Sequence, residues 1–171
     1  PIRVATLAPS GQEQMINNLL RDLKRRVNAR ERPEYVPDWE GFENVFRRQF
    51  SPASSDCRIT LPAQLHADLA ASPSPHLLLM TTLQGHINQM ATRRYEFDVL
   101  FMLIPKAWES YCRKAEENFD LHDQLKAYCA VEKIPMQIVT EAGAISYNDR
   151  ASVMWRLGVA LYAKAGGIPW K

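Results

Sequence analysis

The sequence predicts an α/β domain in which helices cover both faces of a mainly parallel sheet. Short apolar segments alternate with longer segments of helical periodicity, in the order strand, helix, repeated four times. One of these segments, residues 97–104 (FDVLFMLI), is nearly all apolar, which is typical of a strand buried between two layers of helices. The length of 171 residues suits one domain with a core of its own.

The chain begins with a predicted strand and an amphipathic helix. Residues 2–7 are apolar and β-branched, and turn residues follow at 8–11. Residues 12–27 are predicted to be a helix, because apolar residues recur at helical spacing: Met15, Ile16, Leu19, Leu20, Leu23 and Val27. The outer face of this helix carries the basic run 21–26 (RDLKRR). Two interpretations of these basic residues remain: a helix face exposed to solvent, and a contact with a phosphate backbone.

The next part of the chain is less regular. Residues 33–55 are rich in Pro, Ser and aromatic residues. Four of them have the spacing of a short helix that packs on the core: Trp39, Phe42, Val45 and Phe46. Residues 57–60 fit a brief strand. The breaker at residues 72–75 (SPSP) leads into a second long helix over residues 76–94, which tolerates Gly85 at some cost.

After the buried strand at residues 97–104, the sequence predicts an irregular stretch over residues 106–119. Asp120 can cap a helix over residues 121–132, since an Asp side chain accepts a hydrogen bond from a free N–H group of the first turn. Residues 136–140 form the next predicted strand.

The end of the sequence predicts a polar loop over residues 141–150 and a last helix over residues 151–165. Gly166 and Gly167 stop that helix and lead toward another strand. Because the chain opens directly on a strand and ends in this way, we expect it to be part of a longer protein.

Composition narrows the classes of function. The net charge is only +2, so any contact with nucleic acid must come from a local pocket rather than from the overall field. Cys57, Cys112 and Cys129 stand far apart, without zinc-ligand spacing, which predicts a reduced, cytoplasmic protein and no metal–thiolate site. The longest apolar runs are too short to span a bilayer, so we expect no membrane partner.

Common catalytic and nucleotide-binding motifs are absent from the sequence. There is no GxGxxG after the first strand and no GxxxxGK[ST], which argues against a dinucleotide-binding domain and a P-loop. There is also no GxSxG or HExxH. The remaining histidines have no matching partners and are interpreted as surface or helix residues: His66, His76 and His86. The sequence therefore predicts neither a catalytic residue nor a metal site in this chain.

One helix and the strand after it carry an informative set of polar residues. His122 and Lys126 are four residues apart and share a helix face. His122 lies in the first turn, where free N–H groups and the helix dipole favour an anion. Gln137 stands between Met136 and Ile138, and its amide can donate to a phosphate oxygen. An anion site is one interpretation, and an exposed pair beside a solvated edge strand is the other.

The second half of the sequence resembles the MID domain of prokaryotic Argonautes, especially the short ones. The similar segments are FDVLF (97–101), LHDQLKAYC (121–129), IPMQIV (134–139) and LGVALYAKAGGIPW (157–170). In that family a Tyr or His, a Lys, a Gln and a second Lys hold the 5′-phosphate of a guide. The matching positions here are His122, Lys126, Gln137 and Lys164. A cation that offsets the C-terminus of its helix is a second interpretation of Lys164.

The resemblance implies a Rossmann-like guide-binding module over residues 1–145, and over residues 146–171 a helix that connects it to a PIWI domain. It covers residues 97–170, and residues 2–27 more loosely. The residues before the helix at 121–132, about 105–120, would contact the first base of the guide. The family's nuclease residues lie in PIWI, so the resemblance implies no catalysis in this chain.

The resemblance also implies partners. They are a small guide RNA or DNA with a 5′-phosphate, a complementary target strand, and Mg²⁺ that bridges guide phosphates. Short members act in prokaryotic defence with an effector partner that carries a TIR or sirtuin-like domain. Trp39, Phe42 and Phe46 would serve such a protein contact if they are exposed, whereas core packing is the alternative. A Rossmann-like enzyme domain that binds a phosphorylated small molecule is the rival function.

Overall fold

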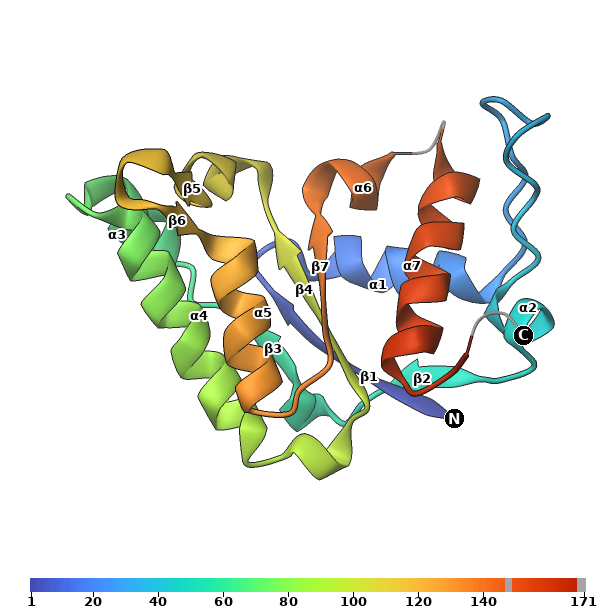
Figure 1. Cartoon of the computed structure of the whole chain (residues 1–171), viewed down its shortest axis with the longest axis horizontal. Coiled ribbons are helices and arrows are strands. Elements are labelled where there is room, and N and C mark those ends of the chain that lie inside the picture. Colours follow the sequence, from blue (N-terminus) through green and yellow to red (C-terminus); the bar gives the residue numbers. More distant parts are fainter. Residues whose placement is uncertain (147–148, 169–171) are drawn as a thin grey trace.

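Residues 1–146 and 149–168 are described by a computed structural model (Figure 1). Its main sheet consists of β1 (Ile2–Ala8), β2 (Phe50–Pro52), β3 (Arg58–Thr60), β4 (Val99–Ile104) and β7 (Met136–Thr140). The strand order is β2-β1-β4-β7, and β3 pairs with the second half of β1. All these pairings are parallel, so the predicted α/β, Rossmann-like layered fold is confirmed.

Helices cover both faces of the sheet, as Figure 1 shows. One face carries α3 (Leu65–Ala71), α4 (Pro75–Ala91) and α5 (Leu121–Val131). The other carries α1 (Glu13–Lys24), α2 (Phe42–Phe46) and α7 (Arg150–Lys164). The buried apolar side chains form two clusters, one between the sheet and each helical layer.

Strand β4 is the centre of the sheet, as its continuous apolar sequence predicts. It lies between β1 and β7, and all six of its residues are buried. Leu100, Met102 and Ile104 belong to the cluster under α4 and α5. The alternate residues of the strand pack under α1 and α7, because successive side chains point to opposite faces.

Between β4 and α5 the chain is irregular, as expected over residues 106–119. Short 3₁₀ turns, η3 (Lys106–Tyr111) and η4 (Ala115–Glu117), alternate with the two strands of a small antiparallel pair, β5 (Arg113–Lys114) and β6 (Phe119–Asp120). Further 3₁₀ turns precede β3 and β4, η1 (Ser55–Cys57) and η2 (Arg94–Glu96).

The first half differs from the prediction in four places, and the simplest is that α4 ends at Ala91 rather than at residue 94. Helix α1 ends at Lys24 rather than at residue 27. The backbone of Arg25 is extended, and Val27 pairs with Trp39 in an isolated antiparallel bridge. Trp39 therefore precedes α2 instead of belonging to it, and its Nε1 donates to the carbonyl of Leu23 at 3.0 Å. The short elements β2 and α3 are not expected from the sequence.

The aromatic residues of this part belong to the core. Trp39 and Phe42 are fully buried, and Phe46 packs half-buried against the same cluster. The interpretation of Trp39 and Phe42 as an exposed partner surface is therefore wrong, and core packing is confirmed.

The predicted polar loop at residues 141–150 is also corrected. Its first half is a short helix, α6 (Glu141–Ile145), which Thr140 caps by accepting from the N–H of Gly143 at 3.2 Å. Arg150 begins α7 and is buried. Tyr147 and Asn148 lie outside the described residues, as do Pro169–Lys171, where the next strand was expected. Gly166, with φ of 88°, stops α7 as predicted.

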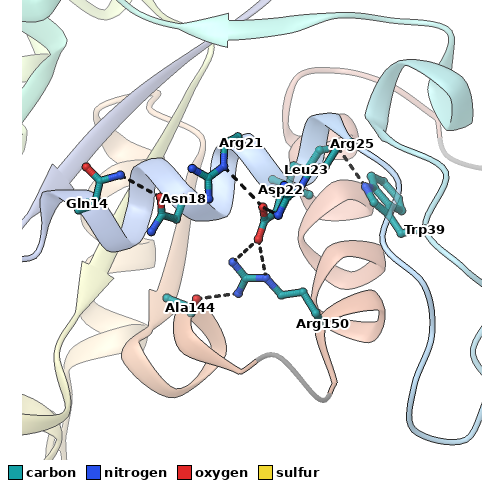
Figure 2. A network of polar contacts seen from close by, with 9 residues as sticks. All are labelled: Gln14, Asn18, Arg21, Asp22, Leu23, Arg25, Trp39, Ala144 and Arg150. Atoms are coloured by element: carbon teal, nitrogen blue, oxygen red, sulfur yellow. Dashed lines mark hydrogen bonds and ion pairs between the residues drawn. The ribbon is translucent and has the colours of Figure 1, made fainter.

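A buried ion pair fixes the start of α7 against α1, as Figure 2 shows. The guanidinium of Arg150 donates to Asp22 Oδ2 from Nε at 3.0 Å and from Nη2 at 2.8 Å. Its Nη1 donates to the carbonyl of Ala144 at 2.6 Å. One arginine thus ties together α1, α6 and α7, and it sets the position of the helix whose far end carries Lys164.

Candidate functional site

A pocket of about 490 Å³ brings together Lys126 from α5 and Lys164 from α7. These helices lie on opposite faces of the sheet. They meet beside β7, which is the last strand in the sheet order. The other residues that line the pocket come from the end of α5, the following turn and the start of β7: Cys129, Ala130, Lys133, Ile134, Pro135 and Met136.

Among the residues that the structure describes, three lysines line this pocket, and no lining residue carries a carboxylate. Within the described part of the chain, none of the three lysines forms an ion pair. Burial lowers the pKa of Lys164, and the nearby charge of Lys126 lowers it further. An anion bound between them would relieve this repulsion, so the arrangement favours a negatively charged ligand.

The wall behind the lysines is apolar and neutral. Cys129, Ile134 and Met136 are buried. Burial, with a smaller contribution from Glu132, raises the pKa of the Cys129 thiol to about 11, so this cysteine is a neutral wall residue and not a nucleophile. Charges act more strongly beside an apolar wall than in open water, which strengthens the attraction between the lysines and an anion.

His122 lies one turn before Lys126 on α5 and is half-buried, but it is not among the residues that line the pocket. The helix N-terminus beside it holds a carboxylate of its own, because Asp120 Oδ1 accepts from the N–H of Asp123 at 3.2 Å. That hydrogen bond is the largest cause of a lowered Asp120 pKa. The N–H of Asp123 is therefore used by the cap, whereas the role of this first turn in holding an anion stays a prediction. The predicted Asp120 cap is confirmed.

Gln137 follows the pocket residue Met136 in β7 but does not itself line the pocket. Its amide Nε2 donates to the carbonyl of Ile138 at 3.0 Å. Val139, two residues on, packs in the cluster under α7, so Gln137 shares the α7 face of the strand. Of the four predicted residues, two meet at the pocket, and His122 and Gln137 flank it.

Lys133 is a pocket residue that the sequence analysis did not identify. It occupies the turn between α5 and β7, with a left-handed φ of 58°. A signal for it exists in the sequence. A lysine between a helix end and the strand-opening Ile134-Pro135 must lie where α5 turns back toward the sheet.

The stretch between β4 and α5 is anchored from two sides. Trp108 is buried and its Nε1 donates to His66 Nδ1 at 3.1 Å. His76 is also buried, not at the surface, and its Nε2 lies 2.5 Å from Glu117 Oε2. Residues of the stretch and of the first turn of α5 border a hollow of about 420 Å³. It is lined by the buried Phe119, the half-buried Asp120, and the exposed Arg113, Ala115, Asn118, Asp123 and Gln124.

No protein-family model matches this sequence, and no curated protein matches it. Within the described residues, no helix is long and apolar enough to cross a membrane. The same residues contain no group of three or more His, Cys, Asp or Glu side chains that would hold a metal ion. The described lining of the pocket offers ammonium groups and no carboxylate, so these residues do not fit Mg²⁺, which needs oxygen ligands.

Proposed function

We propose that this chain anchors the phosphorylated 5′ end of a small guide nucleic acid, in the way of a prokaryotic Argonaute MID domain. The observation that carries the proposal is the pocket in which Lys126 and Lys164 converge, with no carboxylate among its described lining residues. A terminal phosphate carries a charge of about −1.5 to −2 at neutral pH, which two lysines would neutralise. Lys133 would add a third cation for the phosphodiester that follows.

The flanking residues have supporting roles in this proposal. His122 would stack on or support the first nucleotide, since an imidazole ring both stacks and donates hydrogen bonds. Gln137 would exchange its hydrogen bond to Ile138 for one to a phosphate oxygen. Because an amide carries no charge, Gln137→Ala should weaken binding less than the loss of either lysine.

The proposal extends to the whole system that the resemblance implies. Residues 1–145 would be the guide-binding module, and residues 146–171 the helix that leads to PIWI. The guide would pair with a complementary target strand, and an effector protein with a TIR or sirtuin-like domain would act in the same cytoplasmic defence complex. Any Mg²⁺ at this site would take most of its ligands from guide phosphates and water.

A titration of the wild-type chain with two matched oligonucleotides tests the proposal. One has a 5′-phosphate and the other a 5′-hydroxyl, and salt and magnesium are held constant because backbone binding depends steeply on salt. The phosphorylated oligonucleotide should bind roughly ten- to a hundredfold more tightly, the value of a charged hydrogen bond. Equal affinities for the two oligonucleotides would contradict the proposed function. Nucleoside monophosphates that bind as tightly as the oligonucleotide would favour the rival small-molecule function.

A further inference from the structure

A second basic pocket lies at the other end of α7, where the end of α1 and the following segment approach Arg150. Its volume is about 290 Å³. The residues that line it include four arginines and one carboxylate, and they are Asp22, Arg25, Arg26, Val27, Asn28, Arg30 and Arg150. The proposed 5′-phosphate site uses none of them.

Basic residues are dense in the segment that forms most of this pocket, where Arg26 is paired with Asp38 at 2.8 Å and lies 3.8 Å from Glu40. Residues 21–32 (RDLKRRVNARER) contain six basic and two acidic residues, a net charge of +4, whereas the whole chain has +2. The rest of the chain is therefore slightly acidic. A field of this kind attracts polyanions to one place on the surface.

Asp22 holds two of the arginines in position, as Figure 2 shows for Arg150 and Arg25. Its Oδ2 accepts from Arg150, and its Oδ1 lies 2.6 Å from Arg25 Nη2. The side chain of Arg25 is nevertheless 60% exposed. Arg30 is exposed at the pocket and has no ion pair within the described residues. A guanidinium has five donors, so these groups have capacity for a further acceptor.

We propose that this arginine pocket binds a phosphodiester of a nucleic-acid backbone, independently of the 5′-phosphate. Arginine suits phosphate oxygens because its planar donors form two parallel hydrogen bonds. Helix α7 is about 21 Å long between Arg150 and Lys164, from its rise per residue. A stacked strand advances about 3.4 Å per nucleotide, so a strand anchored at Lys164 reaches the arginine pocket after roughly six nucleotides. The identity of the polyanion rests on the proposed function.

The test compares two variants that lose the same charge. Arg25→Gln with Arg30→Gln removes two of the three exposed arginines of the pocket and leaves the third, Arg26, which pairs with Asp38. Arg93→Gln with Arg94→Gln is the matched control, because Arg93 also pairs with a carboxylate, Glu96, and Arg94 has no ion pair within the described residues. Each is titrated at about 50–200 mM salt with 5′-phosphate and 5′-hydroxyl oligonucleotides of about ten nucleotides, long enough to span both pockets.

The pocket variant should bind roughly tenfold more weakly at low salt, and by the same factor for both oligonucleotides. The slope of log affinity against log salt should fall by about 1.4, the value for two lost contacts to a single strand. Arg30→Gln alone, which breaks no ion pair and so spares the fold, should lower the slope by about 0.7. The control variant should bind nearly like wild type.

A pocket variant that binds like its control overturns this inference, and an acidic protein segment then becomes the better occupant. The outcome is separable from the proposed function. In one outcome, wild type binds both oligonucleotides equally, and the pocket variant still binds more weakly and with a smaller salt dependence. That result contradicts the proposed 5′-end site and supports the arginine pocket. If wild type binds the 5′-phosphate oligonucleotide more tightly and the pocket variant has the affinity of its control, the 5′-end site is supported and the arginine pocket is contradicted.

Discussion

Lys126 and Lys164 line one pocket although their helices lie on opposite faces of the sheet. The pocket exists because β7 is the last strand of the sheet, so that α5 and α7 approach each other beside it. The position of Lys164 depends on how α7 packs, and Arg150 fixes the far end of that helix to Asp22. The fold thus determines the distance between two like charges, and an anion between them satisfies both.

Lys164→Gln should weaken binding of a 5′-phosphorylated guide and leave the free protein equally or more stable. Because burial and Lys126 lower its pKa, protonation of Lys164 opposes folding at neutral pH. The difference in melting temperature should shrink as the pH rises through the folded pKa of Lys164, where the wild-type ammonium is lost. Thermal denaturation and titration measure the two effects. Arg48→Gln, which removes an exposed cation outside the pocket and outside residues 105–120, should change neither.

The competing interpretation of Lys164 gives the opposite result. If its charge serves only to offset the C-terminus of α7, Lys164→Gln should lower the melting temperature at pH 7 and leave guide affinity unchanged. That outcome would remove Lys164 from the site.

The sequence predicts those parts of the fold that its local pattern determines. The continuous apolar sequence of β4 predicts that both faces of the strand are buried, and Asp120 predicts the start of α5. Strand β2 and helix α6, with three and five residues, are too short to show a period. They form because β1 supplies an edge for β2, and because Thr140 caps α6.

The candidate site is predictable only in part for the same reason. The spacing of His122 and Lys126 places them on one helix face, as local geometry requires. The approach of Lys164 from the opposite helical layer depends on strand order, which no local pattern contains. The sequence places Lys133 between the end of α5 and Ile134-Pro135, but it does not indicate the left-handed turn through which Lys133 reaches the pocket.

Gly158→Ala should destabilise the protein, because a Cβ at this position would overlap the indole ring of Trp39. We expect a loss of about 1–3 kcal/mol in the free energy of unfolding, as for other overpacked core positions. Gly85→Ala is the matched control in α4, since nothing lies within 4 Å of its added Cβ. It should gain about 0.5–1 kcal/mol from helix propensity. Denaturant titrations that give both changes the same sign would contradict this packing.

Asp22→Ala should cost about 3–5 kcal/mol in the free energy of unfolding, since it removes one partner of a buried ion pair. Glu96→Ala, which breaks the partly exposed pair with Arg93, is the control and should cost far less. Denaturant titration measures both. A similar cost for the two variants would mean that the Asp22–Arg150 pair does not hold α7 in place.

Changing the exposed residues before α5 should alter the preference for the first nucleotide. Arg113→Ala with Asn118→Gly modifies the hollow beside the start of α5, and glycine accepts the φ of 51° at residue 118. The ratio of affinities for 5′-phosphate and 5′-hydroxyl guides should stay the same, because the lysines are untouched. Titrations with four guides that differ only in the first nucleotide measure the preference. An unchanged preference would exclude this loop as the base reader.

The most direct test of the account is the effect of Lys126→Ala on guides with and without the 5′-phosphate. The variant should bind the phosphorylated guide roughly ten- to a hundredfold more weakly, because it loses one charged hydrogen bond. It should bind the 5′-hydroxyl guide almost as wild type does, since that guide offers Lys126 no dianion. Arg48→Ala, at an exposed cation outside the pocket and outside residues 105–120, controls for the lost charge, and salt is fixed throughout. If Lys126→Ala weakens both guides by the same factor, this pocket does not hold a 5′-phosphate.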